Sequence, residues 1–315
     1  MKSIQAVSTT VTHDAPVHHV KPESGSIIRI PLVCDSPHSG TDYPDDFQFS
    51  VAFNELRRSE DTHVEKLWAS VPQYGGELIS ANFPRSYIDP NRAVDDIDQA
   101  MLSAPWPNDC SPSKRCIELG NGLVFSKTTQ LSAIYQRKLS VAEVQNRIDR
   151  YWRPYRESLT DALQSAARNH GLRWHLNLHS MPSNAYQRLG IVTDKKLADI
   201  VLGNVHGVSC SAEFTQVVAE LFAALGYSVA INDPYAGQDL LRQYGQPEQG
   251  FQSLQIEINR ALYLNEDTRE PIARFPQLQA DIGQVLKGIA AYIQVALQTQ
   301  SSLSTTGASQ HQGVL

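Results

Sequence analysis

Two histidines stand directly behind short apolar runs, where a metal ion could be held. His38 follows residues 27–34 (IIRIPLVC) after a short turn, and His179 follows residues 174–178 (WHLNL). A short apolar run that ends at a turn signal predicts a buried strand. A lone histidine after a strand is more often a hydrogen-bonded structural residue, but two of them near acidic residues are typical of a metal site. Catalytic zinc favours imidazole and carboxylate ligands and keeps one position open. We therefore predict His38 and His179 as zinc ligands, with a structural role as the alternative.

The third ligand is expected among residues 59–63 (SEDTH). Asp61 is the preferred candidate, and Glu60 and His63 are the alternatives. The competing interpretation of this stretch is a solvated helix start, because acidic side chains are favourable near a helix N-terminus.

A single glutamate interrupts the last apolar strand pattern. Glu257 lies in residues 253–258 (SLQIEI), where Gln255, Glu257 and Asn259 share one face. A carboxylate on an inner face is costly unless it is paired, and catalytic bases are often placed this way. We predict that Glu257 takes a proton from the attacking water and then protonates the leaving amine. The alternative is a salt bridge with Arg260 or another arginine.

Arginines close to these positions suit an acidic substrate. Arg85 and Arg92 flank Asp89 in a polar loop, and Arg188 follows the second histidine along the chain. The guanidinium fork offers two N–H donors that match the two oxygens of a carboxylate. We predict that these arginines bind a small anionic substrate. Alternatively, Arg85 or Arg92 pairs with Asp89 and braces the loop.

The other common classes of chemistry lack their sequence signatures. No G-x-S-x-G motif surrounds a serine, and residues 203–207 (GNVHG) match neither a P-loop nor a dinucleotide-binding motif. The formal net charge of −6 argues against a nucleic-acid partner, which selects for a basic face.

The elements that position these residues alternate between strands and helices. We predict further strands over residues 77–83, 189–193 and 228–232, and helices over residues 53–71, 140–170, 211–225 and 277–297. Pro154 is expected to kink or divide the second of these helices. Residues 95–122 read as an irregular wall of the active site. The alternation predicts an α/β fold with a mixed, mostly parallel sheet and helices on both faces, where ligands bind beyond the carboxyl ends of the strands.

Composition sets the remaining expectations. Apolar residues make up 41% of the 315 residues, enough for a large core, and we predict one domain over residues 26–297. Residues 1–25 are expected to be a flexible lead-in without the apolar region of a signal peptide, and residues 298–315 a disordered tail. No apolar run reaches the roughly 18 to 20 residues that a membrane span needs.

The four cysteines form no C-x-x-C pair, and we interpret them as reduced thiols in the cytoplasm. A disulfide between Cys110 and Cys116 is the lesser alternative. The oligomeric state is not predicted.

A set of short motifs resembles the N-formylglutamate amidohydrolase family over residues 30–270, approximately. The matching stretches occur in the order of the family's motifs. They are residues 36–40 (SPHSG), 61–65 (DTHVE), 84–92 (PRSYIDPNR), 178–181 (LHSM), 202–210 (LGNVHGVSC), 232–237 (NDPYAG), 244–245 (YG) and 255–263 (QIEINRALY). Each motif is short, and the ordered set carries the resemblance.

The family is distantly similar to zinc carboxypeptidases and aspartoacylases, and this implies a phosphorylase/hydrolase-like fold with one metal ion held by two histidines and an acid. By this resemblance His38 and His179 match the histidines, Asp61 matches the acid, and Glu257 matches the general base. The pair Asn91 and Arg92 is similar to the pair that grips a substrate carboxylate.

The resemblance further implies zinc-dependent hydrolysis of N-formyl-L-glutamate to L-glutamate and formate, a step of histidine degradation. One departure concerns spacing: the first histidine and the acid lie three residues apart in the carboxypeptidases, whereas His38 and Asp61 are separated by a long segment here. Another N-acyl amino acid or short peptide as substrate, or non-catalytic binding of an acidic metabolite, are the alternatives.

Overall fold

The computed structural model describes residues 15–23, 25, 27–237 and 239–309. Within these residues seven strands form one sheet in the order β1-β3-β2-β4-β7-β5-β6. The strands are β1 (Val17–Val20), β2 (Leu32–Ser36), β3 (Glu77–Ala81), β4 (Arg173–Met181), β5 (Ile200–Gly203), β6 (Val229–Ile231) and β7 (Phe251–Asn259). Strand β1 runs antiparallel to β3 and β5 runs antiparallel to β7, while the other four pairings are parallel. The predicted α/β class with a mixed, mostly parallel sheet is confirmed.

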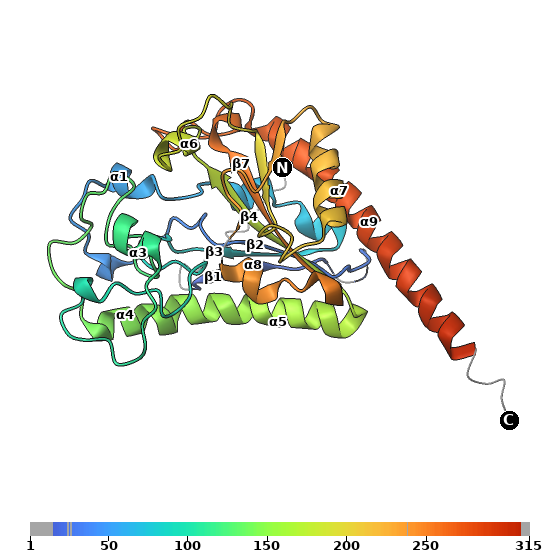
Figure 1. Cartoon of the computed structure of the whole chain (residues 1–315), viewed down its shortest axis with the longest axis horizontal. Helices are drawn as coiled ribbons and strands as arrows, with labels where there is room; N and C mark the ends of the chain where they lie inside the picture. Colours follow the sequence, from blue (N-terminus) through green and yellow to red (C-terminus); the bar gives the residue numbers. More distant parts are fainter. Residues whose placement is uncertain (1–14, 24, 26, 238, 310–315) are drawn as a thin grey trace, which may run out of the picture.

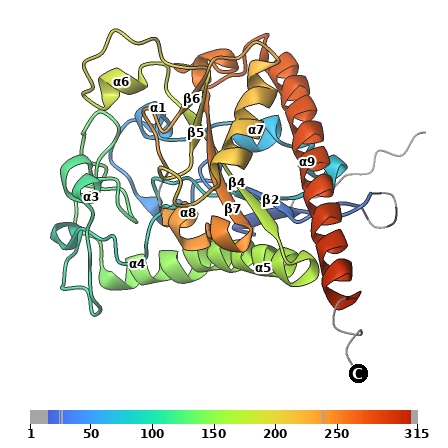
Figure 2. The ribbon, with the colours of Figure 1, turned by 45° about the vertical axis from the view of Figure 1, so that its right-hand side comes forward.

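Helices cover both faces of this sheet (Figure 1). They are α1 (Phe53–Arg57), α2 (Val64–Leu67), α3 (Lys114–Leu119), α4 (Val141–Arg147), α5 (Arg153–His170), α6 (Ala185–Arg188), α7 (Ala212–Ala223), α8 (Asp239–Tyr244) and α9 (Phe275–Ser309). Helices α2, α7 and α9 pack on one face and α5 and α8 on the other, so each face has its own apolar core. Figure 2 shows α7 and α9 side by side, with α5 beneath the opposite face.

The side chains of each strand alternate between the two faces of the sheet, and this determines which helices they contact. On β4, Leu176 and Leu178 belong to the core under α7 and α9. The intervening residues, Asn177 and His179, therefore point to the α5 side, because successive side chains of a strand alternate between faces. The same alternation on β7 places Glu257 between Ile256 and Ile258 and on the α5 side. The polar residues of the two central strands thus collect on one face.

The predicted helix over residues 53–71 is wrong as a continuous element. It is divided into α1 and α2, and His63 between them adopts a left-handed conformation with φ of 69°. His63 immediately precedes α2, and a left-handed residue does not continue a helix. The buried carboxylate of Glu60 holds the break, because it accepts hydrogen bonds from both Arg57 and Thr62. The break leaves Asp61 on a turn.

The predicted strand over residues 189–193 is also wrong. These residues form a loop after α6, and the side chain of Val192 is fully exposed. Their apolar character had suggested a strand, but the strand in this part of the chain is β5, about ten residues later. Helix α8 was not predicted. The strand predicted over residues 27–34 begins later, at Leu32, and ends at Ser36.

The other predicted elements are confirmed with shifted ends. The long helix is divided into α4 and α5 by a π-helical turn at Ile148–Trp152, immediately before Pro154. Helix α9 runs to Ser309, so the tail predicted to be disordered from residue 298 begins as helix.

The N-terminal segment departs from its prediction as well. Residues 1–14 lie outside the described residues, but Val17–Val20 form edge strand β1, so the lead-in predicted to be flexible is partly structured. The four cysteines are unpaired. In the described part of the chain we find no helix with the length and apolarity to cross a membrane.

Candidate metal and substrate site

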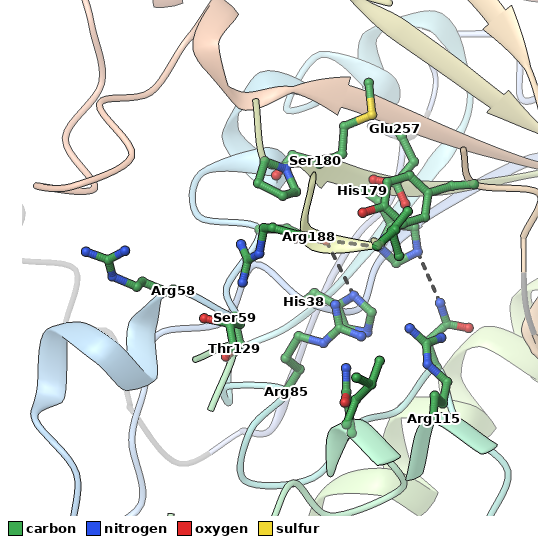
Figure 3. Close-up of a pocket in the computed structure, with 18 of the residues that line it drawn as sticks. His38, Arg58, Ser59, Arg85, Arg115, Thr129, His179, Ser180, Arg188 and Glu257 are labelled. Carbon is green, nitrogen blue, oxygen red and sulfur yellow. Dashed lines mark hydrogen bonds and ion pairs between the residues drawn. The ribbon is translucent and has the colours of Figure 1, made fainter. Parts of the chain in front are cut away.

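A cavity of about 430 Å³ opens at the carboxyl ends of the central strands (Figure 3). His38 lies two residues beyond β2, His179 lies near the end of β4, and Glu257 lies near the end of β7. The register of the parallel pair sets His179 opposite Glu257. The position is the one expected for ligand sites in open α/β sheets.

The structure brings the three predicted metal ligands together. One ligand atom each from His38, Asp61 and His179 can be chosen so that all lie within 4.8 Å of one another, and all three side chains are buried. Asp61 Oδ2 lies 3.0 Å from His179 Nδ1 and 3.4 Å from His38 Nδ1. The backbone N–H of Asp61 donates to the carbonyl of His38 at 2.9 Å, which holds the turn before α2 against the end of β2. This turn brings the acid to the first histidine despite their separation in sequence.

The two alternative third ligands lie elsewhere. Glu60 is buried and accepts hydrogen bonds from Tyr43, Arg57 and Thr62. His63 lies beside the carbonyl of Arg269. Neither lines the cavity, so the geometry favours Asp61.

In each of the two histidines, the ring nitrogen Nε2 lies beside an acceptor oxygen of another side chain. His38 Nε2 lies 2.7 Å from Asp89 Oδ1, and His179 Nε2 lies 2.7 Å from Asn177 Oδ1. Asn177 in turn donates from Nδ2 to the buried Asp35 at 2.8 Å, which turns its oxygen toward the histidine. With the ring proton on Nε2, facing these acceptors, the Nδ1 lone pair of each ring is available to a metal ion, as in carboxylate–histidine–metal arrangements.

The donor set fits a divalent metal ion such as zinc. Two imidazole nitrogens and one carboxylate are a common set of protein ligands for catalytic zinc. His38 Nδ1 is buried and has no hydrogen-bond partner among the described residues. Buried polar atoms normally have a hydrogen-bond partner, so this unpaired nitrogen supports a metal ligand role for His38.

Asp61 is held as a carboxylate. Burial raises its pKa, but the contacts with His179 and His38 and the charge of Arg260 lower it, and the resulting pKa lies well below the usual value. Arg260 donates from Nη2 to Asp61 Oδ1 at 2.7 Å. The other oxygen, Oδ2, faces the two histidines.

Glu257 differs from Asp61 in its surroundings. Burial, together with the nearby charge of Asp61, raises the pKa of Glu257 to about 7, against the opposing charge of His179. Gln255 Nε2 donates to its Oε1 at 3.1 Å. No ion pair of Glu257 is found among the described residues, since Arg260 pairs with Asp61 instead. A carboxyl group with a pKa near neutrality can both accept and return a proton.

The predicted substrate-binding residues all line the cavity. Arg85 pairs with Asp89 at 2.7 Å, so the bracing role considered for it is present in the structure. Arg92 donates to the carbonyls of Asn91 and Asn121. The Asn91 side chain lies 3.1 Å from His179 Nε2. Arg188 is exposed at the rim.

Several residues that line this cavity were not predicted from the sequence. Arg58, Arg115, Lys127 and Arg260 also line it, as does Tyr235. Residues 95–122 had been predicted as an active-site wall, and Arg115 and Asn121 do line the cavity, although α3 interrupts this stretch. Arg115 carried no signal beyond that wall. Pairing of Asp89 with Arg85 or Arg92 was the alternative to substrate binding, and Asp89 lies beside both arginines, but its contact with His38 was not predicted.

The fold and the site together define a class: an α/β protein with a buried histidine–aspartate–histidine cluster and a glutamate at the carboxyl ends of its strands. The sequence pattern of the N-formylglutamate amidohydrolase family matches residues 30–264. The chain belongs to this family, as its motifs predicted.

Known proteins agree with this assignment. The chain is 49% identical to the N-formylglutamate amidohydrolase from Ralstonia eutropha JMP134, whose crystal structure superposes with a TM-score of 0.87 and covers 90% of this chain and 99% of the other. An N-formylglutamate deformylase from Pseudomonas aeruginosa is 26% identical over 266 residues, 83% of this chain and 90% of the relative. A gene product from Agrobacterium tumefaciens, 15% identical with a TM-score of 0.58 over 88% of this chain and 97% of its own, shares the fold.

Proposed function

We propose that this protein is a zinc-dependent amidohydrolase that cleaves N-formyl-L-glutamate to L-glutamate and formate. The observation that carries the proposal is the buried cluster of His38, Asp61 and His179 beside Glu257, at the base of a cavity lined by cations. Membership of the family and similarity to proteins named for this reaction support the choice of substrate. A place in histidine degradation and a cytoplasmic location are part of the same proposal.

His38, Asp61 and His179 would hold the metal ion. When bound, zinc supplies Lewis-acid polarisation of the formyl carbonyl and lowers the pKa of water. Asp89 and Asn177 hold the two imidazole rings so that both Nδ1 atoms face the space beside Asp61 Oδ2. This preorganisation leaves little rearrangement for binding.

Glu257 moves the proton in this proposal. As a carboxylate it accepts a proton from the attacking water, whose oxygen forms a bond to the formyl carbon. It then delivers that proton to the amide nitrogen as the carbon–nitrogen bond breaks. The second proton of the water also passes to the amine, so the products are formate and glutamate with a protonated amino group. The raised pKa of Glu257, about 7, suits both halves of the transfer.

The cationic side chains bind and orient the substrate. Arg92 and Arg85, together with Asn91, would contact a carboxylate from one side. Arg188 would contact it from the rim. Fixed donors of this kind convert substrate binding into alignment of the amide with the attacking group.

The test measures formate release from N-formyl-L-glutamate by the purified protein, before and after removal of metal by a chelator and restoration with zinc. We expect activity that chelation abolishes and zinc restores. His38→Ala and His179→Ala should each lose bound zinc and lower activity by about 10³-fold or more, since a metal contributes several kcal/mol to transition-state stabilisation. His18→Ala, an exposed histidine on β1, is the matched control and should retain both.

Undiminished zinc in both cavity variants would contradict the metal assignment. A panel of other N-formyl and N-acetyl amino acids tests the substrate. Equal activity across the panel would favour a different N-acyl amino acid or a short peptide. Tight binding of acidic amino acids without hydrolysis by the zinc-loaded protein would favour a binding protein.

A further inference from the structure

Cations far outnumber acids around the cavity. Seven cationic side chains line it, against the two carboxylates of Asp61 and Glu257. The cations are Arg58, Arg85, Arg92, Arg115, Lys127, Arg188 and Arg260. An excess of one charge on a partly buried surface is unfavourable unless a ligand of opposite charge enters it.

Most of these cations already have protein partners. Arg85 and Arg92 lie beside Asp89, at 2.7 and 3.8 Å, and Arg260 pairs with Asp61. Arg58 lies 3.5 Å from Asp267. Lys127 donates to a backbone carbonyl of α3.

Two guanidinium groups remain without a partner. The side chains of Arg115 and Arg188 form no hydrogen bond or ion pair with any residue that the structure describes. Figure 3 shows them on either side of the imidazole of His38. An acidic N-acyl amino acid brings two carboxylates into such a cavity, so the number of unpaired guanidinium groups equals the number of charges it carries.

Helix α3 presents Arg115 on a well-anchored support. Asp96 accepts from both the backbone and the hydroxyl of Ser113, at 2.7 and 3.1 Å, and Ser113 caps the helix through Cys116. Cys116 is buried beneath, where a Cβ on Gly122 would collide with its sulfur. The support is therefore fixed although the surrounding segment is largely irregular.

The surroundings of Arg115 favour an anion. The charge of Arg92 is the largest cause of a fall in its pKa to about 9, followed by burial and by the charge of Arg85. The charge of Asp89 is the first opposing cause at both Arg115 and Arg92, and this carboxylate is already engaged with Arg85 and with His38. A carboxylate placed at Arg115 would relieve this repulsion.

We propose that Arg115 binds one of the two carboxylates of the substrate and thereby makes the site select a dicarboxylate over a monocarboxylate. The inference rests on the proposed function, since the reacting amide must lie at the histidine cluster. Arg188 is placed to bind the other carboxylate. A substrate that lacks the charge opposite Arg115 would leave this half-buried guanidinium desolvated and unpaired, and that loss is the source of the selectivity.

The test compares three substrates of nearly the same size on wild-type protein and Arg115→Gln. They are N-formyl-L-glutamate, N-formyl-L-glutamine and N-formyl-L-isoglutamine, and each amide removes one carboxylate. We expect Arg115→Gln to lower kcat/KM for the diacid by roughly 10- to 100-fold, as for loss of a hydrogen bond to a charged group. The amide that keeps the carboxylate bound by Arg115 should show the same loss, and the other amide a change of no more than about threefold.

Two further variants separate charge from structure. Arg115→Lys should recover part of the loss, because it keeps the charge without the fork. Lys114→Gln is the matched control, since Lys114 lies on the same helix with 85% of its side chain exposed, and it should behave as wild type on all three substrates. Equal losses of Arg115→Gln on all three substrates, or no loss, would overturn the proposal.

Failure of the proposed function gives a different result. In that case the wild-type protein hydrolyses none of the three compounds. Calorimetric binding of the same compounds to zinc-loaded wild type and Arg115→Gln then decides the inference. A preference for the diacid that the variant loses supports it, and an unchanged preference overturns it.

Discussion

The base of the cavity and its wall are built in opposite ways. The base consists of the buried cluster His38, Asp61 and His179, and outer partners hold the second nitrogen of each histidine. The wall consists of Arg58, Arg85, Arg92, Arg115, Lys127 and Arg188, of which two have no partner among the residues that the structure describes. The base is set by the protein's own hydrogen bonds, whereas the wall has charges in excess. The difference indicates that the base is preorganised for a metal and that the wall is completed by the substrate.

Glu257→Gln at the base should have the largest effect. The amide keeps the size of the side chain but accepts no proton, so kcat for N-formyl-L-glutamate should fall by roughly 10²- to 10⁴-fold while bound zinc is unchanged. Activity and metal content are measured together. Glu248→Gln, an exposed glutamate outside the cavity, serves as the control. Loss of zinc along with activity would mean that Glu257 is itself a metal ligand and that the cluster at the base includes a fourth residue.

Asp89→Asn should have a smaller effect, because it changes the base only through His38. A neutral amide is a weaker acceptor for Nε2–H, and zinc affinity should fall by about 10- to 100-fold. Competition with a chelator measures the affinity, and the melting temperature monitors the fold. Asp46→Asn removes a carboxylate that accepts from the Tyr87 hydroxyl, outside the cavity, and should leave the zinc affinity unaltered. An unchanged affinity in Asp89→Asn would mean that the base does not depend on its outer partners.

Arg188→Gln on the wall should have the smallest effect. The side chain is exposed, so its contact with a carboxylate is screened by solvent, and KM should rise by roughly 3- to 10-fold with kcat and zinc content nearly constant. Steady-state kinetics at two salt concentrations check this. Arg242→Gln, an exposed arginine away from the cavity, is the control. A fall in zinc content would show that wall and base are not independent.

Local pattern was sufficient for much of the fold. Apolar runs bounded by turn residues identified the central strands β4 and β7, and helical spacing identified α7 and α9. The pattern failed where long-range contacts overrode it. Residues 53–71 have helical spacing throughout, but buried hydrogen bonds around Glu60 break the helix. Residues 189–193 are apolar enough for a strand, but no neighbouring strand pairs with them.

The site residues that lie at the ends of strands could be predicted from the sequence. His38, His179 and Glu257 stand at the ends of apolar runs, and the structure places all three beside one cavity. Asp89 and Arg115 had no such signal. The contact of Asp89 with His38 joins segments 51 residues apart, and Arg115 lies on a short helix in a proline-rich stretch. Contacts of this kind follow from the packing of the whole chain and not from local spacing.

The crowding of cations around one cavity also has a kinetic consequence. The chain as a whole carries a net charge of −6, yet this cavity is positive. A cleft lined by one sign of charge focuses the field and raises the capture rate of opposite charges by about 10- to 10³-fold at low salt. The same attraction acts after hydrolysis, when two separate anions occupy the space that one substrate entered. The cationic residues that speed substrate binding would thus slow product dissociation. We therefore expect product release to limit turnover.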